Sequence, residues 1–360
     1  MILRSITTEN FRNLESAEHN FHPSANIVVG RNGQGKTNLL EAIYFLATTK
    51  SFRTTHIDSL VRFGAPSVFV GGHVEREGVT RNVTAGVEAG ETKRRVLMIN
   101  GERVGLSSYL NALTVFAYSA MRLETIRGAP EERRRFLDRG IASINPGYLE
   151  ELTRYGRVLK QRNALLHAIS IGDDKARSLD AWDEPFTFAA NAVQTARGAY
   201  ARELAASFSR IVAEHNYQVR GIEMVYHPST GNLWDLRKHE VRARMSVIGP
   251  QRDNIDFVID GRPAAEVLSG GELKTIVLFL KFAKLSLFRR RFDEPPLFVL
   301  DDIDAELDLD ILQKLLSKLP DSTQVFASSA KESFLQALEA GPHRRLTIEN
   351  GRVTTASNYP

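Results

Sequence analysis

The sequence contains no cysteine, and none of its 360 residues belongs to an uninterrupted apolar run of about 18 residues. The first absence excludes disulfides and thiolate-bound metals. The second excludes a membrane-spanning helix, and residues Met1–Thr7 lack the apolar core of a secretory signal peptide. The chain also lacks internal repeats, low-complexity segments and a heptad run long enough for an extended coiled coil. These absences together favour a globular protein of the cytoplasm.

The composition is that of an ordinary globular chain, with 42% hydrophobic and 25% charged residues. Its length predicts about two domains. The formal net charge of +4 and the sequence pI near 9.2 permit a nucleic acid as partner without requiring one.

Residues 30–37 read Gly-Arg-Asn-Gly-Gln-Gly-Lys-Thr and match the phosphate-binding loop pattern Gly-x-x-x-x-Gly-Lys-Thr. The apolar run Asn26–Val29 predicts a buried strand before the loop, and apolar residues at helical spacing follow it. Glycines let successive N–H groups point at one anion, lysine adds a charge for the β- and γ-phosphates, and threonine offers a hydroxyl to Mg²⁺. The predicted nucleotide contacts are Gly30, Arg31, Asn32, Gly33, Gln34, Gly35, Lys36 and Thr37.

The secondary-structure pattern changes twice along the chain. Alternating residues predict strands over 67–74, 79–87 and 95–99, and a short apolar run predicts another over 114–118. From residue 131 to 212 the pattern is helical, with breaks near 145–147 and 171–174, and strands return near 223–226 and 255–259. We therefore predict one sheet-rich domain formed by residues 1–122 and 245–360, with a mainly helical lobe, residues 123–244, inserted into it.

Leu268-Ser269-Gly270-Gly271-Glu272, the signature segment, precedes a long amphipathic pattern. Ser269 is well placed to cap a helix whose free N–H groups bind an anion. By itself, the same pattern is equally that of an ordinary N-cap turn.

Leu297–Asp302 is a buried-strand pattern that ends in two carboxylates, Asp301 and Asp302. In phosphate-loop nucleotide hydrolases a strand of this kind supplies the Mg²⁺ ligand and the residue that accepts a proton from the attacking water. Here these roles fall to Asp301 and Asp302, with Lys36 as the third catalytic candidate. A strand that ends in a solvated acidic turn is the alternative.

Phosphate loop, signature segment, acidic strand end and the Ala-Glu-Leu-Asp that ends at Asp308 occur in the order found in ABC-type ATPases, and the chain most resembles the RecF family of recombination mediators. The resemblance implies a mixed α/β fold: an ABC-type phosphate-loop ATPase head with an inserted helical second lobe and no long coiled coil. It extends from the first strand to residue 308, and the segments that carry it are 9–14, 32–43, 50–53, 133–138 and 249–253.

The resemblance also implies an ATP-gated homodimer with ATP and Mg²⁺ as cofactors. One subunit would bind ATP through Lys36 and Thr37, with Asp301 and Thr37 at the metal. Ser269, Gly270 and Gly271 of the second subunit would close over the γ-phosphate, and Asp308 would lie in a loop that crosses the interface. Arg12 and Asn13 match positions that contact adenosine.

As a function, the resemblance implies DNA binding at gapped or junction DNA in recombinational repair, replication restart and the SOS response. RecO and RecR would be the partners with which the protein helps to load recombinase on single-stranded DNA.

Two departures from the ABC-type pattern favour a slow, DNA-stimulated ATPase that acts as a switch. Asp302 stands where most heads have glutamate, and Ser328-Ser329 stands where most have histidine. No glutamine for the Mg²⁺-sensing loop is evident after residue 118.

The DNA-contacting residues cannot be chosen from the sequence. Solvated surfaces and helix ion pairs also explain the arginine clusters at 94–95, 133–135 with 139, 242 with 244, and 289–291. An SMC-like chromosome-structure ATPase, a phosphate-loop phosphotransferase and a transporter ATPase subunit are the alternative functions. The insertion of roughly 100 residues is too short for an SMC arm, and the signature segment argues against a phosphotransferase.

Overall fold

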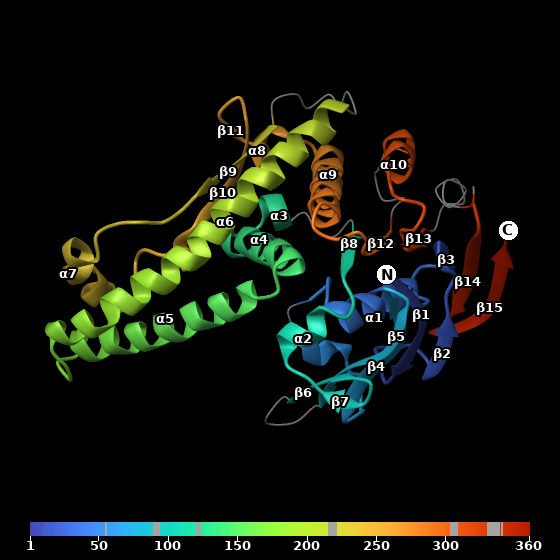
Figure 1. Cartoon of the computed structure of the whole chain (residues 1–360), viewed down its shortest axis with the longest axis horizontal. Helices are drawn as coiled ribbons and strands as arrows, with labels where there is room; N and C mark the ends of the chain where they lie inside the picture. The colour runs from blue at the N-terminus through green and yellow to red at the C-terminus, as the bar shows by residue number, and fades with distance from the viewer. Residues whose placement is uncertain are drawn as a thin grey trace. The chain divides into compact units, whose positions relative to one another are not determined.

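The computed structural model describes residues 1–360 except 55, 89–93, 120–123, 215–221, 303–308, 330–338 and 340. The chain forms two compact units (Figure 1). The first, here called the head, consists of Met1–Leu123 and Ser269–Pro360, and the second, the lobe, of Glu124–Leu268. The sequence predicted that the lobe ends at residue 244, but it extends to Leu268. The later strands of this region pair with one another and pack on lobe helices.

An antiparallel sheet forms one layer of the head, in the strand order β2-β1-β4-β5-β6-β7. Its strands alternate buried and exposed residues, as in a sheet with one face on the core. An Asn100-Gly101 turn joins β6 to β7 with both residues at positive φ. The strands are β1 (Ile2–Glu9), β2 (Ala17–Asn20), β4 (Ser67–Arg76), β5 (Val79–Glu88), β6 (Arg94–Ile99) and β7 (Glu102–Arg103).

The second sheet of the head has the order β15-β14-β3-β13-β12-β8 and is parallel except for the edge strand β15. Parallel strands buried on both faces read as continuous apolar runs, which explains why 26–29, 114–118 and 297–301 were visible in the sequence. The strands are β3 (Ala25–Val29), β8 (Val115–Ser119), β12 (Leu297–Asp301), β13 (Val325–Ser328), β14 (His343–Glu349) and β15 (Arg352–Tyr359).

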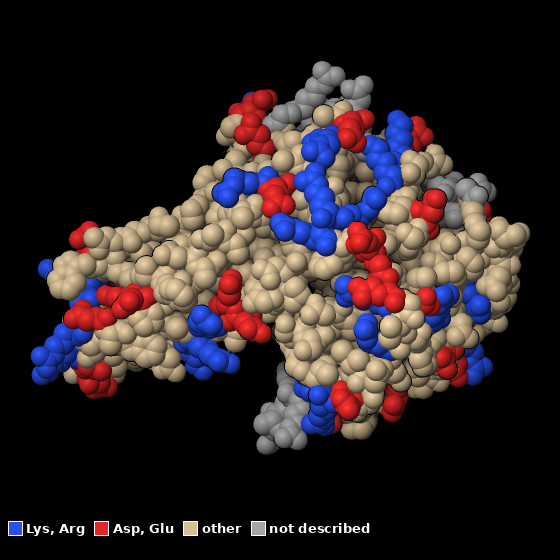
Figure 2. All heavy atoms as spheres, viewed as in Figure 1, with Lys and Arg blue, Asp and Glu red and all other residues tan. Residues whose placement is uncertain are grey.

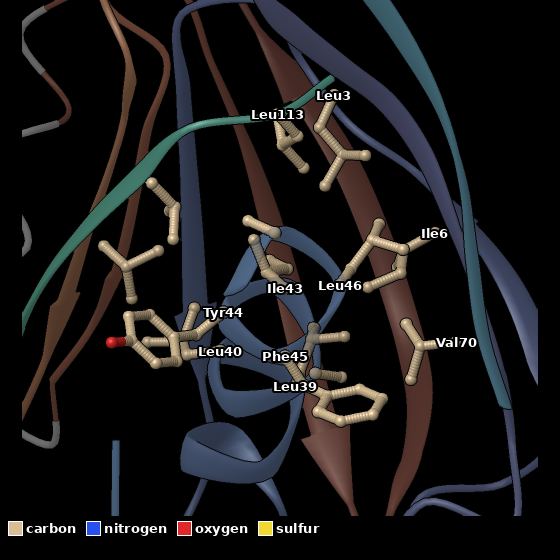
Figure 3. Packing of buried hydrophobic residues seen from close by; sticks show 14 of the residues in the cluster. Leu3, Ile6, Leu39, Leu40, Ile43, Tyr44, Phe45, Leu46, Val70 and Leu113 are labelled. Atoms are coloured by element: carbon tan, nitrogen blue, oxygen red, sulfur yellow. The ribbon is translucent and has the colours of Figure 1, made fainter. Parts of the chain in front are cut away.

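Helix α1 (Lys36–Thr48) begins directly after the phosphate loop and contacts strands of both sheets. Ten of its thirteen residues are buried, so it is apolar on nearly every side. Figure 3 shows Leu39, Ile43, Phe45 and Leu46 packed among side chains from strands such as β1 and β4. The remaining head helices are α2 (Leu106–Leu110), α9 (Gly270–Arg289), α10 (Leu309–Leu316) and a 3-10 turn at Ile57–Leu60.

Gln324, just before β13, is fully buried and ties the two sheets together. Its side chain accepts from the Leu3 N–H at 2.7 Å and donates to the carbonyls of Leu3 at 2.9 Å and His22 at 2.8 Å. A buried amide with all these partners links β1 and the residues before β3 to the start of β13.

The lobe combines long helices with the small sheet β11-β10-β9. The helices break where the sequence predicted, since one helix ends at Ile144 and another spans Tyr148–Ser170. Its elements are α3 (Glu124–Arg127), α4 (Pro130–Ile144), α5 (Tyr148–Ser170), α6 (Asp180–Glu214), α7 (Leu233–Ala243), α8 (Ala264–Val267), β9 (Ile222–His227), β10 (Asn254–Ile259), β11 (Arg262–Pro263) and 3-10 turns at Ala176–Leu179 and Pro250–Arg252.

A buried ionic network in the lobe accounts for two of the segments that carry the family resemblance. Asp253 is fully buried and accepts from Arg197 at 2.8 Å, Tyr226 at 2.6 Å and Gln194 at 2.7 Å. The other edge of the Arg197 guanidinium donates to both carboxylate oxygens of Asp138. Segments 133–138 and 249–253 therefore hold α4, α6, β9 and β10 together.

The longest helices of the described residues are α5 and α6, with 23 and 35 residues. Neither approaches the hundreds of residues of an SMC arm, so the predicted absence of a long coiled coil is confirmed. In the part of the chain that the structure describes, no helix has the length and apolarity needed to cross a membrane.

Candidate nucleotide-binding site

The phosphate loop joins the end of β3 to the start of α1, as the motif requires. Gly30, Gly33 and Gly35 all have positive φ, of 147°, 80° and 116°. Gly30 has a second constraint, because a Cβ there would lie 2.4 Å from the carbonyl oxygen of Ile348 in β14. Only glycine therefore lets this loop leave β3 alongside β14 and curl over the helix N-terminus.

Lys36 is buried to all but 4% and points back into the loop. Its ammonium donates to the carbonyls of Gly30 at 2.7 Å and Arg31 at 3.2 Å. The charge is therefore held inside the ring of loop amides, where the β- and γ-phosphates of a nucleotide would lie.

Asp301, the last residue of β12, lies beside the start of α1. Its carboxylate accepts from the Ser328 hydroxyl at 2.9 Å and is hydrogen-bonded by the Thr37 side chain. Burial, with a smaller contribution from neighbouring Asp302, raises the pKa of Asp301 to about 6, although the two hydroxyls act in the opposite direction. The structure thus brings together the two predicted metal ligands, Thr37 and Asp301, at a site where burial disfavours the charged carboxylate.

This pair suits Mg²⁺. The cation takes oxygen ligands and is usually held by one or two protein groups together with phosphates and waters. The described residues contain no cluster of three or more His, Cys, Asp or Glu side chains that would make a protein-only metal site. Thr37 and Asp301 would hold Mg²⁺ on the phosphates, and the bound cation would neutralise charge on the oxygens.

Asp302, the candidate general base, has a left-handed backbone with φ of 50°. Its N–H donates to the Ser328 hydroxyl at 3.1 Å. One serine, at the end of β13, therefore contacts both residues of the acidic pair. In this structure the position that carries histidine in most ABC-type heads holds the Asp301 carboxylate and the Asp302 backbone by hydrogen bonds.

The Arg12 side chain, predicted to contact adenosine, forms an ion pair within the head. Its guanidinium makes a two-pronged ion pair with Glu41, a carboxylate of α1 with no exposed surface, and donates to the Ser59 carbonyl at 3.1 Å. Ser51 also donates to Glu41, and Arg53 lies 3.7 Å from it. These bonds use three of the five N–H groups of the guanidinium and fix the segment beside the loop, and a contact of Arg12 with adenosine stays a prediction.

Asn13 does lie at the loop. Its side-chain oxygen accepts from Asn38 at 2.5 Å and would be 3.3 Å from a Cβ on Gly35. Asn13 also lines a polar cavity of about 490 Å³. The other lining residues are Glu15, Arg62, Glu349, Asn350, Arg352 and Thr354.

That cavity joins the phosphate loop through the β14–β15 turn. The Asn350 N–H donates to the Gln34 side chain at 2.7 Å, and the Gly351 N–H donates to the Gln34 carbonyl at 2.8 Å. A nucleoside attached to phosphates on the loop could extend into this space.

The signature segment starts α9 as predicted. Ser269 accepts from the Glu272 N–H at 3.3 Å, and Glu272 accepts from the Ser269 N–H at 2.8 Å, which forms a capping box. Ser269 is exposed. Among the hydrogen bonds of the described residues, none joins residues 269–271 to the phosphate loop of the same chain. The N-terminus of α9 is therefore capped, and within the described residues it makes no hydrogen bond to the phosphate loop of its own chain.

Two expectations fall outside the described residues. Asp308 lies in 303–308, and most of the expected glutamine-loop stretch lies in 120–123. Sequence reasoning missed Glu41 and the Ser328 contact to Asp301. The first had a signal, since an acidic residue in an otherwise apolar helix pattern implies a buried partner.

The basic clusters differ in their availability. Arg133 and Arg134 donate to lobe backbone carbonyls, and Arg135 pairs with Glu131 and Glu132. These side chains are therefore used within the lobe. In Figure 2, Lys and Arg side chains gather on the surface where Figure 1 places α9 and α10. These helices carry Lys274, Lys281 and Lys314.

Comparison with known proteins gives a consistent result along the whole chain. The model of the RecF/RecN/SMC N-terminal domain family matches residues 2–352. The DNA replication and repair protein RecF of Geotalea daltonii is 32% identical, with 98% of this chain and all of the relative covered. RecF of Gloeobacter violaceus is 33% identical, with 98% of each chain covered.

Solved structures agree with this result. The recombination mediator protein RecF with ATP, from the RecFOR pathway, superimposes with a TM-score of 0.88 at 25% identity and covers 100% of this chain and 98% of that one. An SMC head bound to the C-terminal winged-helix domain of ScpA gives 0.56 at 16% identity, a likeness of fold alone. The ABC-type head expected from the sequence is thereby confirmed.

Proposed function

The chain belongs to the RecF family of DNA replication and repair proteins, within the RecF/RecN/SMC N-terminal group, and we propose that it is an ATP-gated dimer that binds DNA. In this proposal ATP binds to the phosphate loop of one subunit. The signature helix of the second subunit then closes over the γ-phosphate. The RecF structure with ATP supports ATP as the nucleotide.

The observation that carries the proposal is the divided nucleotide site. Lys36, Thr37 and Asp301 meet at one place in the head. The exposed N-terminus of α9, with Ser269 as its cap, offers free N–H groups but has no hydrogen bond to that place within the described residues. A second copy of the chain is the simplest source of an α9 N-terminus for each phosphate loop.

Slow hydrolysis is the second part of the proposal. Asp302 is one methylene shorter than the usual glutamate, and Ser328 bonds to Asp301 and Asp302. A base that reaches its water poorly lowers the rate of proton transfer, so the closed dimer should persist. Long-lived closure suits a protein that marks gapped or junction DNA and, with RecO and RecR, helps to load recombinase on single strands.

Dimer formation can be tested by measuring the mass of the full chain in solution with Mg²⁺ and ATP or no nucleotide. We expect a monomer without nucleotide and a dimer with ATP. Lys36→Met should remove both ATP binding and the dimer, because the phosphates lose their fixed charge. Ser269→Arg should bind ATP as a monomer and fail to dimerise, because the larger cation blocks the second half of the site.

Ser209→Arg is the matched control, since Ser209 is an exposed serine of α6. It should dimerise like the unmodified protein. A wild-type chain that stays monomeric with ATP, with and without DNA, would contradict the gate. A Ser269→Arg variant that dimerises normally would contradict the role of the signature helix alone.

DNA binding can be tested separately by fluorescence anisotropy with gapped duplex, blunt duplex and single-stranded oligonucleotides of equal length. We expect ATP to raise the affinity for the gapped duplex most, and the affinity to fall with salt as phosphates are contacted. Equal affinity for all three oligonucleotides, unaffected by ATP, would contradict the proposed preference for gapped DNA without contradicting the ATP-gated dimer.

A further inference from the structure

The lobe contains an open groove of about 700 Å³ that no part of the nucleotide site explains. One wall is helix α6 and the other is strand β9, which contacts that helix (Figure 1). The groove lies wholly within the lobe.

The groove runs along the edge of β9. Three consecutive residues of the strand, Met224, Val225 and Tyr226, line it. Successive side chains of a strand point to opposite faces, so consecutive residues can share one groove only where it follows the backbone edge. One edge of β9 pairs with β10. In the part of the chain that the structure describes, the edge that faces the groove pairs with no strand. Its outward N–H and C=O groups are available for pairing.

The side chains along the α6 wall of the groove change from apolar to small and then to basic. Asn191, Thr195, Gly198, Arg202 and Ala205 line the groove at spacings of three and four residues, which form one stripe of α6. Small side chains in the middle of the stripe leave room beside the strand. One turn before Asn191 the same stripe carries Phe188, a large apolar side chain that is 66% exposed.

Arg202 lies towards the other end of the stripe. It is exposed and has no ion pair within the described residues. An aromatic side chain and an unpaired cation therefore lie 14 helix positions apart, or about 21 Å along the axis. An extended chain covers this distance in about six residues.

We propose that this groove binds an extended peptide segment of a partner protein, which adds a strand to the free edge of β9. The segment carries an apolar residue that packs on Phe188 and, about six positions away, an acidic residue that pairs with Arg202. Main-chain hydrogen bonds to β9 supply affinity, and these two side chains supply direction and specificity. A nucleic acid fits less well, because Arg202 is the one basic residue among those that line the groove.

The test uses the full chain and a phage-displayed library of random decapeptides, with Gly198→Leu for counter-selection. A Cβ on Gly198 would meet only ordinary contacts, the Arg202 guanidinium and the Tyr226 ring each at 3.7 Å, so a leucine there takes up groove space beside both residues. It should also favour the helix, since glycine is a poor helix former. We expect enriched peptides to contain an apolar and an acidic residue about six positions apart.

Synthetic copies of the enriched peptides then test the binding mode. Amide hydrogen exchange should show new protection at β9 on binding, because its outward N–H groups become paired. Phe188→Ala and Arg202→Glu should each lower the affinity by about tenfold or more, as anchors do. Ala199→Leu is the matched control on an exposed position of the same helix outside the groove, and should leave binding unchanged.

Three results would overturn the proposal. They are no enrichment over the counter-selected variant, enriched peptides that leave the exchange of β9 unchanged, and protection of β9 by an oligonucleotide in place of a peptide. Each variant should still form the ATP-dependent dimer, so failure here is distinguishable from failure of the proposed function.

Discussion

Replacing Asp301 with asparagine should stabilise the nucleotide-free, metal-free head while removing a predicted Mg²⁺ ligand. The side chain is only 1% exposed, and burial raises its pKa to about 6 from an ordinary value of 3.8. Neighbouring Asp302 adds repulsion, and the hydroxyls of Ser328 and Thr37 offset part of the cost. Asparagine keeps an oxygen for Ser328 but carries no charge.

The sign of the pH dependence follows from which state binds the proton more tightly. The folded pKa of Asp301 lies above the unfolded one, so the folded protein holds this proton up to a higher pH. Stability is therefore lost as the pH rises from about 4 to about 6, and the whole cost remains above that range. A shift of about two units corresponds to about 3 kcal/mol, an upper figure for the gain on substitution.

Thermal unfolding with EDTA at pH 4.5 and pH 7.5 measures this effect. A domain of this size gains about 2–4 °C in Tm per kcal/mol, so Asp301→Asn should unfold at a higher temperature than wild type at pH 7.5, by at most about 6–12 °C. The gain should be much smaller at pH 4.5, where both proteins are largely uncharged at this position. Asp321→Asn, at an exposed site, is the control and should change little at either pH. No gain at pH 7.5, or an equal gain at both, would refute the argument.

Three further substitutions test particular contacts. Gln324→Leu should cost about 2–4 kcal/mol in thermal unfolding, because backbone groups of two sheets lose their partner; an unchanged Tm would show that the sheets hold without it. Asp253→Ala should cost the lobe about 3–5 kcal/mol by leaving Arg197 buried and half-paired, seen as lost amide protection in α6, and full protection would contradict the network. Gly30→Ala should lower the affinity for a fluorescent ATP analogue by about tenfold or more, since it combines strain with a backbone clash. Gly33→Ala, which meets nothing within 4 Å, should be milder, and equal losses would argue against the clash.

The parts of the head that the sequence predicted are those with local signals. Continuous apolar runs marked the central parallel strands, the glycine pattern marked the loop, and Ser269 with Glu272 marked the start of α9. Strands β14 and β15 were not predicted, because their residues are of mixed character: β14 acquires burial beside β3, and β15, at the edge of the sheet, stays largely exposed. The lobe boundary was misjudged for the same reason: β9 and β10 resemble any strands until their partners are known.

Within the site, residue types were predictable and their partners were not. Nothing in the sequence indicates that Arg12 is neutralised by Glu41, 29 positions later, since many arginines could meet that carboxylate. In the sequence, the Arg133–Arg135 cluster fits a nucleic-acid surface, a solvated face or helix ion pairs, whereas the structure shows Arg134 donating to the carbonyl of Asp253. Charge in a sequence sets how many cations exist, whereas burial decides which of them are available.

The residues that lower the stability of the head without nucleotide also explain how nucleotide binding could drive closure of the proposed dimer. Burial disfavours the charge of Asp301, Asp302 has a left-handed backbone, and the Lys36 ammonium donates to loop carbonyls. Mg²⁺ and ATP would neutralise the carboxylate and replace the carbonyls as partners of the ammonium. Free energy released at the phosphate loop is then available to favour the closed state. By this argument the left-handed backbone of Asp302 and the raised pKa of Asp301 contribute to the proposed ATP switch. A head in which substitutions remove both features would be more stable and less responsive to ATP.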